Sequence, residues 1–182
     1  MKIAGIIAGF LVVVVGFLGF VAPKQMVIQK EVVIEKSKDL VFSDLVMMKN
    51  HNRWSPWNKK DPNIVINHSD PDGVVGASMS WKGNKEVGEG IQEIKAIKPG
   101  ERIDYELRFK EPMEDTSQAF LMTEALGPDQ TKVTWGMKGE TPFPRNIICM
   151  LMNLKPQVEK EFEAGLASLK TQLEQSPATA TE

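Results

Sequence analysis

The sequence predicts an α+β fold, in which a curved antiparallel sheet wraps around a long C-terminal helix, preceded by one N-terminal transmembrane helix. Three observations lead to this prediction. Apolar and polar residues alternate along several segments between residues 26 and 138, which is typical of strands with one solvated face. From residue 147 to 173, apolar residues recur every three or four positions, which indicates a helix. Residues 3–22 contain no charged or strongly polar side chain, and twenty helical residues span about 30 Å, the thickness of the bilayer hydrocarbon.

Residues 3–22 are therefore expected to be an uncleaved membrane anchor. A signal peptide is the alternative, but Phe20 lies where a cleavage site needs a small residue, and Pro23 would follow the cut. The expected division is an anchor over 1–23, one domain over 24–174 and a disordered tail over 175–182. We expect a single-pass protein of the bacterial inner membrane. The lysines on both sides of the anchor leave its orientation open.

The first strand is expected over residues 26–35, followed by a short helical region that Ser37 or Asp39 could cap. This region must end at the corner Trp54-Ser55-Pro56-Trp57, because proline interrupts a helix. We expect Trp54 to anchor the core there, and Trp57, which a polar run follows, to lie nearer a cavity mouth.

About six further strands are expected over residues 64–69, 75–82, 87–97, 102–110, 117–126 and 132–138, separated by Pro-, Gly- and Asp-rich turns. The C-terminal helical stripe contains Pro156. Either the helix kinks at this residue, or a short helix ends and a long one begins with Pro156 in its first turn.

Composition excludes several classes of function. The 182 residues carry a net charge of −2 with no basic stripe, which disfavours nucleic-acid binding. The two histidines, His51 and His68, do not have metal-ligand spacing, and Cys149 is the single cysteine in an apolar run. We therefore expect no metal site, no cofactor and no nucleophilic cysteine.

Several motifs together resemble a known family. They are the Trp54–Trp57 corner with Asp61-Pro62, Gly73-x-x-Gly76, Trp81-Lys82-Gly83-Asn84, Gly88-x-Gly90 and Thr141-Pro142-Phe143-Pro144. As a set they resemble the polyketide cyclase/dehydrase-type branch of the SRPBCC (START/Bet v 1-like) superfamily, over residues Gln25 to Leu173. The resemblance implies the helix-grip fold and a ligand cavity between the sheet and the long helix. It implies no particular activity, because fold does not determine function.

The expected cavity lining consists of apolar side chains on the concave face of the sheet, at the corner and on the helical side. The predicted ligand-binding residues are Trp57, Met79, Trp81, Tyr105, Phe109, Trp135, Met137 and Phe143, with Leu107, Met150 and Leu154 as further neighbours. The alternative is that these side chains simply fill the core.

Three functions remain open at this point. The first is a membrane-anchored binding module for a hydrophobic small molecule or lipid. The second is a cyclase-, dehydratase- or hydrolase-like enzyme that uses Glu124, Tyr105 or His51 as acid or base. Glu124 would enter the cavity if Phe120 and Met122 face inward, and would be solvated if Leu121 and Ala125 do so. The third is a protein-interaction domain, with an exposed apolar patch near the tryptophan corner and Phe143.

Overall fold

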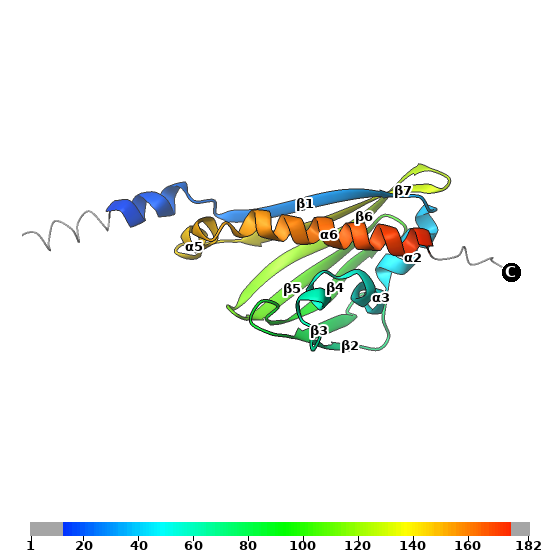
Figure 1. The fold of residues 1–182 in the computed structure, drawn as a ribbon, viewed down its shortest axis with the longest axis horizontal. Helices are drawn as coiled ribbons and strands as arrows, with labels where there is room; N and C mark the ends of the chain where they lie inside the picture. The colour runs from blue at the N-terminus through cyan, green and yellow to red at the C-terminus, as the bar shows by residue number, and fades with distance from the viewer. Residues whose placement is uncertain (1–12, 176–182) are drawn as a thin grey trace, which may run out of the picture.

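Seven strands form one antiparallel sheet, in the order β1-β7-β6-β5-β4-β3-β2, in the computed structural model, which describes residues 13–175 (Figure 1). Residues 13–21 are helical and precede the sheet. The remaining elements are β1 Gln25–Ile34, α2 Lys38–Val46, α3 Met48–Trp54, α4 Trp57–Lys60, β2 Val65–His68, β3 Ser78–Lys82, β4 Glu89–Lys98, β5 Arg102–Glu111, β6 Asp115–Gly127, β7 Gln130–Glu140, α5 Arg145–Leu151 and α6 Leu154–Gln175.

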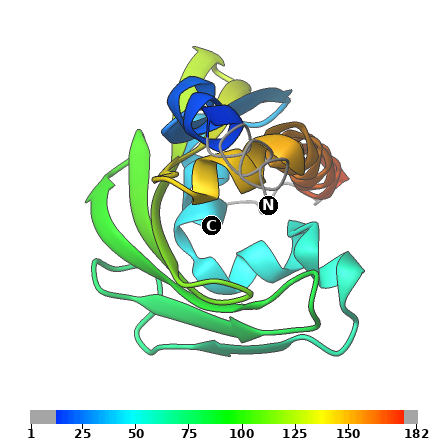
Figure 2. The same ribbon diagram turned by 90° about the vertical axis from the view of Figure 1, so that its left-hand side faces the viewer.

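The sheet curves around α6, and α2, α3 and α4 lie on the same concave side (Figure 2). Irregularities in the β4–β5 register, at Glu89/Gly90 and Ile94/Ala96, accompany this curvature, because bulges bend a sheet. The α6 helix buries Phe162, Leu166, Leu169 and Leu173 in a core that it shares with the sheet and α2. The predicted sheet and covering helix are confirmed.

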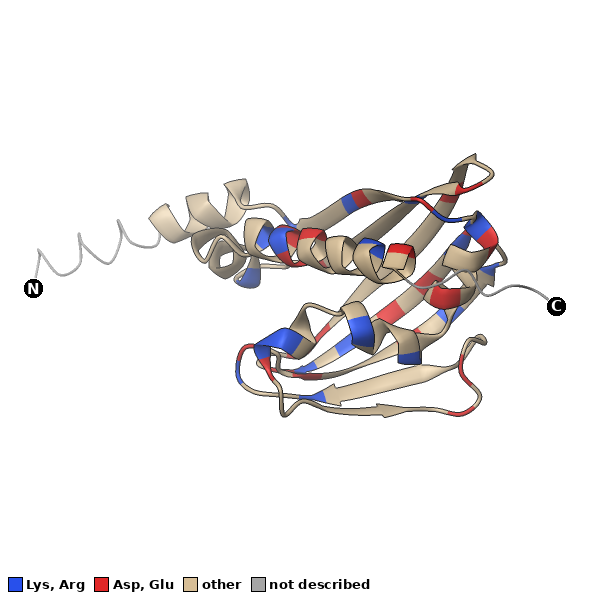
Figure 3. Ribbon diagram, turned by 45° about the vertical axis from the view of Figure 1, so that its right-hand side comes forward, with Lys and Arg blue, Asp and Glu red and all other residues tan. Residues whose placement is uncertain are grey.

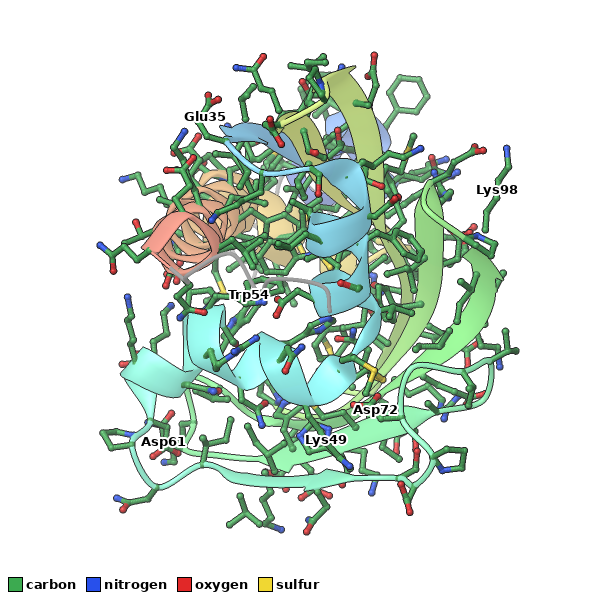
Figure 4. The ribbon with its side chains drawn as sticks, turned by 90° about the vertical axis from the view of Figure 1, so that its right-hand side faces the viewer. Glu35, Lys49, Trp54, Asp61, Asp72 and Lys98 are labelled. Atoms are coloured by element: carbon green, nitrogen blue, oxygen red, sulfur yellow. The ribbon has the colours of Figure 1, made fainter. Side chains whose placement is uncertain are left out.

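The helical region before the corner is broken in two at Met47, which adopts an extended conformation between α2 and α3. Asp72 explains the break, because its carboxylate accepts hydrogen bonds from the N–H groups of Met48 (3.1 Å) and Lys49 (3.0 Å), the first residues of α3. Figure 4 shows Asp72 beside Lys49. Ser37 occupies the N-cap of α2, but its hydroxyl makes no capping hydrogen bond.

The predicted corner forms where expected. The α3 helix ends at Trp54, and Pro56 occupies the N-cap position of the short helix α4. Asp61 then ties the corner to the β3–β4 hairpin, since its carboxylate accepts the N–H groups of Asn63 (2.9 Å) and Asn84 (2.6 Å). The corner is therefore attached to the sheet at the β3–β4 hairpin.

At the C-terminal end, the second alternative for Pro156 is the observed one. The α5 helix ends at Leu151, Asn153 takes a positive φ of 52°, and α6 starts at Leu154 with Pro156 in its first turn. Leu151 departs from the expected apolar stripe, because it is 70% exposed at the end of α5.

No helix within residues 13–175 combines the length and apolar character needed to cross a membrane. Residues 3–12 of the predicted anchor, and residues 176–182 of the predicted tail, lie outside the described part of the chain. The anchor thus stays a prediction.

Candidate functional site

A cavity of about 260 Å³ lies between the concave face of the sheet, the α3–α4 corner and α6. Its wall is mostly apolar and aromatic. Seven of the eight predicted ligand-binding residues line it, namely Trp57, Met79, Trp81, Tyr105, Phe109, Trp135 and Met137, and so does Leu107. Their role in ligand binding stays a prediction.

One side of the cavity is a cluster of aromatic rings from four elements, α3, α4, β7 and α6. Trp135 of β7 stacks on Phe162 of α6, with ring centroids 3.9 Å apart and planes 13° apart. Trp54 and Trp57 meet Trp135 edge-on, at 5.2 and 5.7 Å. Trp54 is 2% exposed and Trp57 is half-buried, so the corner carries one core indole and one nearer the surface. Figure 4 shows Trp54 between α3 and α6.

The opposite side is formed by β3, β4 and β5. Trp81 of β3 meets Phe109 of β5 edge-on at 5.7 Å, and the Trp81 indole N–H donates to the carbonyl oxygen of Val87 at 3.4 Å. Gly90 provides the space for Trp81, since a Cβ at this position would lie 2.5 Å from the indole ring. A glycine in a strand is thus explained by a close side-chain approach.

His51 and Tyr105 share one acceptor in the cavity wall. The Nε2 of His51 lies 2.7 Å from the carbonyl oxygen of Leu45, and the Tyr105 hydroxyl lies 3.5 Å from the same oxygen. Because a carbonyl oxygen only accepts, Nε2 carries the proton in neutral His51. Burial lowers the pKa of His51 to about 4 and raises the pKa of Tyr105 well above its ordinary value. Both side chains are therefore neutral near pH 7.

Most other polar side chains of the wall also have protein partners. Asn52 contacts Nε2 of His68 at 3.0 Å and receives a hydrogen bond from Asn58 on its backbone carbonyl. The Ser117 hydroxyl donates to Asp115 (3.3 Å), and Asp115 pairs with Arg145 at 2.8 Å. Groups that already have a protein partner contribute little directional recognition of a ligand.

Two groups expected in the cavity lie elsewhere. Phe143 is 61% exposed and packs toward Gly19, where a Cβ would lie 2.8 Å from its ring. Because the chain between β7 and α5 continues past the end of the sheet, Phe143 does not reach the wall. Met150 and Leu154 line a second pocket instead of the main cavity.

A second pocket of about 310 Å³ lies between the start of β1, the end of β7 and the α5–α6 turn. Cys149, Met150 and Leu154 contribute to it from the helical side. Met26 lines both this pocket and the main cavity, so its side chain borders the two spaces. Sequence patterning placed Met26 in a strand, but nothing in the pattern indicated this shared position.

Glu124 is exposed to solvent, which was the expectation if Leu121 rather than Phe120 faces inward. The β5–β6 and β6–β7 registers place Leu121 inward, and the Glu124 carboxylate pairs with Lys132 of β7 at 2.5 Å on the outer face. The described residues, 13–175, contain no group of three or more His, Cys, Asp or Glu that could hold a metal ion.

Solved structures share this architecture at low sequence identity. The protein CV1439 from Chromobacterium violaceum aligns with a TM-score of 0.59 and 16% identity, covering 82% of this chain and 98% of that chain. The Aha1 dimer from Colwellia psychrerythraea gives 0.58 and 16%, covering 82% and 96%. Ara h 8.0201 gives 0.53 and 15%, covering 81% and 99%. The chain has a Bet v 1-like helix-grip fold.

These similarities establish the fold and nothing finer, because all three identities are far below the level at which function is shared. No protein-family model matches the sequence, and a search of curated proteins gives no significant match. The helix-grip fold is nevertheless one in which a sheet and a long helix enclose a space, which agrees with the cavity described above.

Proposed function

We propose that this protein is a membrane-anchored binding module for a hydrophobic small molecule, held between the sheet and α6. The observation that carries the proposal is the cavity of about 260 Å³ with its aromatic wall. Natural ligand sites are concave and mostly apolar, with a few polar groups. The motifs that resemble the polyketide cyclase/dehydrase-type branch, and the apolar segment 3–22, support the class of ligand and the anchor.

The dimensions of the cavity restrict the ligand. A volume of about 260 Å³ lies just below the range of ~300–1,000 Å³ for drug-sized sites. We therefore expect a small ring system or a single acyl or isoprenoid chain, because a lipid with two acyl chains would not be enclosed.

Six polar side chains of the wall already have protein partners: His51, Asn52, Asn58, Tyr105, Asp115 and Ser117. Selection by size and apolar surface follows from this arrangement, since few hydrogen-bonding groups are available to a ligand. We expect a permissive site that accepts several hydrophobic molecules of similar volume.

The two other functions receive less support. Acid–base catalysis near pH 7 needs groups with a pKa near 7, whereas burial lowers the pKa of His51 to about 4 and raises that of Tyr105. Glu124, the third candidate, lies outside the cavity. A partner-binding patch at the tryptophan corner is also disfavoured, because Trp54 is buried and Trp57 half-buried.

The test is a matched pair of variants on β6. Ala119 lines the cavity, and Ala125 is exposed on the same strand. Full-length protein in detergent is extracted for mass spectrometry and then screened by thermal shift against single-chain lipids, isoprenoids and small polycyclic compounds. Saturation at ~100 times Kd stabilises the folded state by about 2.7 kcal/mol. We expect Ala119→Phe to lose this ligand-induced shift and Ala125→Phe to keep it.

Each variant is compared with its own ligand-free melting temperature, because filling a packed site can itself cost ~1–3 kcal/mol. The proposal fails if no compound co-purifies and no compound shifts the wild type. It also fails if Ala119→Phe binds as well as Ala125→Phe.

A further inference from the structure

The end of the domain where the chain enters the sheet carries an exposed apolar surface. We call four exposed side chains on α5 and at its two ends the apical patch; they are Phe143, Ile148, Leu151 and Met152. Ile148, Leu151 and Met152 are spaced three and four residues apart and share one face of the helix. None of these four side chains lines the main cavity.

The opposite face of α5 is fixed to the end of the N-terminal helical segment. Asn146 is 1% exposed, and its amide nitrogen donates to the carbonyl oxygens of Gly19 (3.1 Å) and Ala22 (3.2 Å). The Thr141 hydroxyl donates to the carbonyl oxygen of Pro23 at 2.9 Å. These contacts place α5 beside residues 19–23, which is where the predicted anchor ends.

The charges around α5 agree with an interfacial position. From Thr141 to Leu154 the sequence has one charged residue, Arg145, which pairs with Asp115. In Figure 3, α5 and the N-terminal helical segment are almost free of coloured charge, unlike the rest of the molecule. Lys24 and Lys155 flank this region. Basic side chains next to a membrane-embedded segment are attracted to anionic lipid headgroups.

We infer that α5 docks in the interfacial layer of the bilayer, with the apical patch among the lipid chains and headgroups. This inference rests on the anchor proposed above. If Ala22 lies at the membrane boundary, then α5 lies at the same depth through Asn146, and its exposed apolar face has lipid rather than water as its surroundings. A short amphipathic helix with such a face buries it about 5–10 Å into the interface.

Docking also orients the domain toward its ligand source. The second pocket lies behind α5, where Cys149 and Met150 form part of its wall. Met26 is the side chain that this pocket shares with the main cavity. A hydrophobic molecule leaving the bilayer beside α5 would therefore pass Met26 to reach the aromatic wall.

The test uses two exposed leucines at opposite ends of the domain. Leu151 is 70% exposed in the apical patch, and Leu126 is 48% exposed near the β6–β7 turn (Figure 1). In a Cys149→Ala background, Leu151→Cys or Leu126→Cys is labelled with an environment-sensitive fluorophore. Full-length protein is reconstituted into phosphatidylethanolamine–phosphatidylglycerol vesicles, with and without nitroxide lipids. We expect roughly a twofold loss of emission at position 151, for a label held about 5–10 Å deep, and none at 126.

The outcomes separate this inference from the anchor itself. Equal quenching at the two positions, in protein that floats with the vesicles, would overturn docking of α5 and leave the anchor intact. If the protein does not float with the vesicles, both the anchor and the docking of α5 are refuted. As a further check, Met152→Glu should restore emission at position 151 without affecting flotation. Unchanged quenching in that variant would show that the apolar face does not drive docking.

Discussion

Protonation of His51 should destabilise the folded domain as the pH falls from 6.5 to about 4. Burial lowers the pKa of this histidine from 6.5 to about 4. Above pH 6.5 the imidazole is neutral in both the folded and unfolded states, so its contribution to stability is complete. Between pH 6.5 and 4 the unfolded chain binds a proton that the folded chain does not, which favours unfolding. Below about pH 4 both states are protonated, and no further change comes from this group.

The magnitude follows from the difference between the two pKa values. A fall from 6.5 to about 4 corresponds to about 3.5 kcal/mol in full, at ~1.4 kcal/mol per pKa unit. This is a large part of the ~5–15 kcal/mol by which a domain is typically stable. Carboxylates whose pKa is lowered in the folded state, such as Asp72 and Glu174, also lose their contribution in acid. A variant of His51 is therefore needed to separate its contribution to the acid-induced loss of stability from that of the carboxylates.

The variant is His51→Gln, whose amide can still donate to the carbonyl oxygen of Leu45. Urea unfolding of full-length protein in non-ionic detergent is followed by tryptophan fluorescence at several pH values. We expect the wild type to lose about 3 kcal/mol more than His51→Gln between pH 7 and 4. His68→Gln is the control and should show a smaller difference, because His68 is less buried. Parallel pH profiles for the wild type and His51→Gln would refute the reasoning.

Three further predictions concern the corner, the anchor contact and the shared wall. Trp54→Ala should cost ~3–5 kcal/mol in urea unfolding, as truncation of a buried aromatic residue does, and Trp57→Ala should cost less; the reverse order would contradict the assignment of the core indole. Asn146→Ala leaves the carbonyl oxygens of Gly19 and Ala22 without this donor and should cost ~1–3 kcal/mol, with faster hydrogen exchange in α5; unchanged exchange would mean that the amide does not hold the helix. Met26→Trp should slow ligand uptake in a stopped-flow binding measurement, whereas Val27→Trp, on the exposed face of the same strand, should not; equal association rates would place the ligand path elsewhere.

The strands could be predicted from the sequence because their signal is local. In β5 and β7 apolar residues alternate with charged or small ones, so one face of each strand is defined by its own residues. The long helix α6 was equally clear, since Phe162, Leu166, Leu169 and Leu173 repeat at helical spacing. At Pro156 the geometry of proline allowed only two outcomes, a kinked helix or a new helix with Pro156 in its first turn.

The break at Met47 could not be predicted, because its cause lies far along the chain. Val46, Met47 and Met48 contain no helix breaker, and the helix could continue through them on local propensity. Asp72 is 24 residues beyond Met48 and caps a new helix there. Tertiary contacts that supply a cap override propensity in this way.

The cavity shows the same division between local and distant causes. Residues of the concave face were placed correctly because strand alternation determines which side they point to. Phe143 was misplaced because it follows the last strand, where alternation no longer applies. For Glu124 both phases of β6 were compatible with the local sequence, and only the pairing with β7 distinguishes them.

The polar residues of the cavity wall have a structural origin that sequence patterning missed. The α2 helix ends at Val46, and the last carbonyl groups of a helix lack partners within it. His51 of α3 and Tyr105 of β5 both approach the Leu45 carbonyl oxygen, so they join the end of α2 to the next helix and to the sheet. An imidazole and a phenol in a cavity would ordinarily indicate catalysis. Here their shared acceptor and their buried, neutral state indicate that they complete a helix end, which leaves the apolar wall as the part of the cavity available to a ligand.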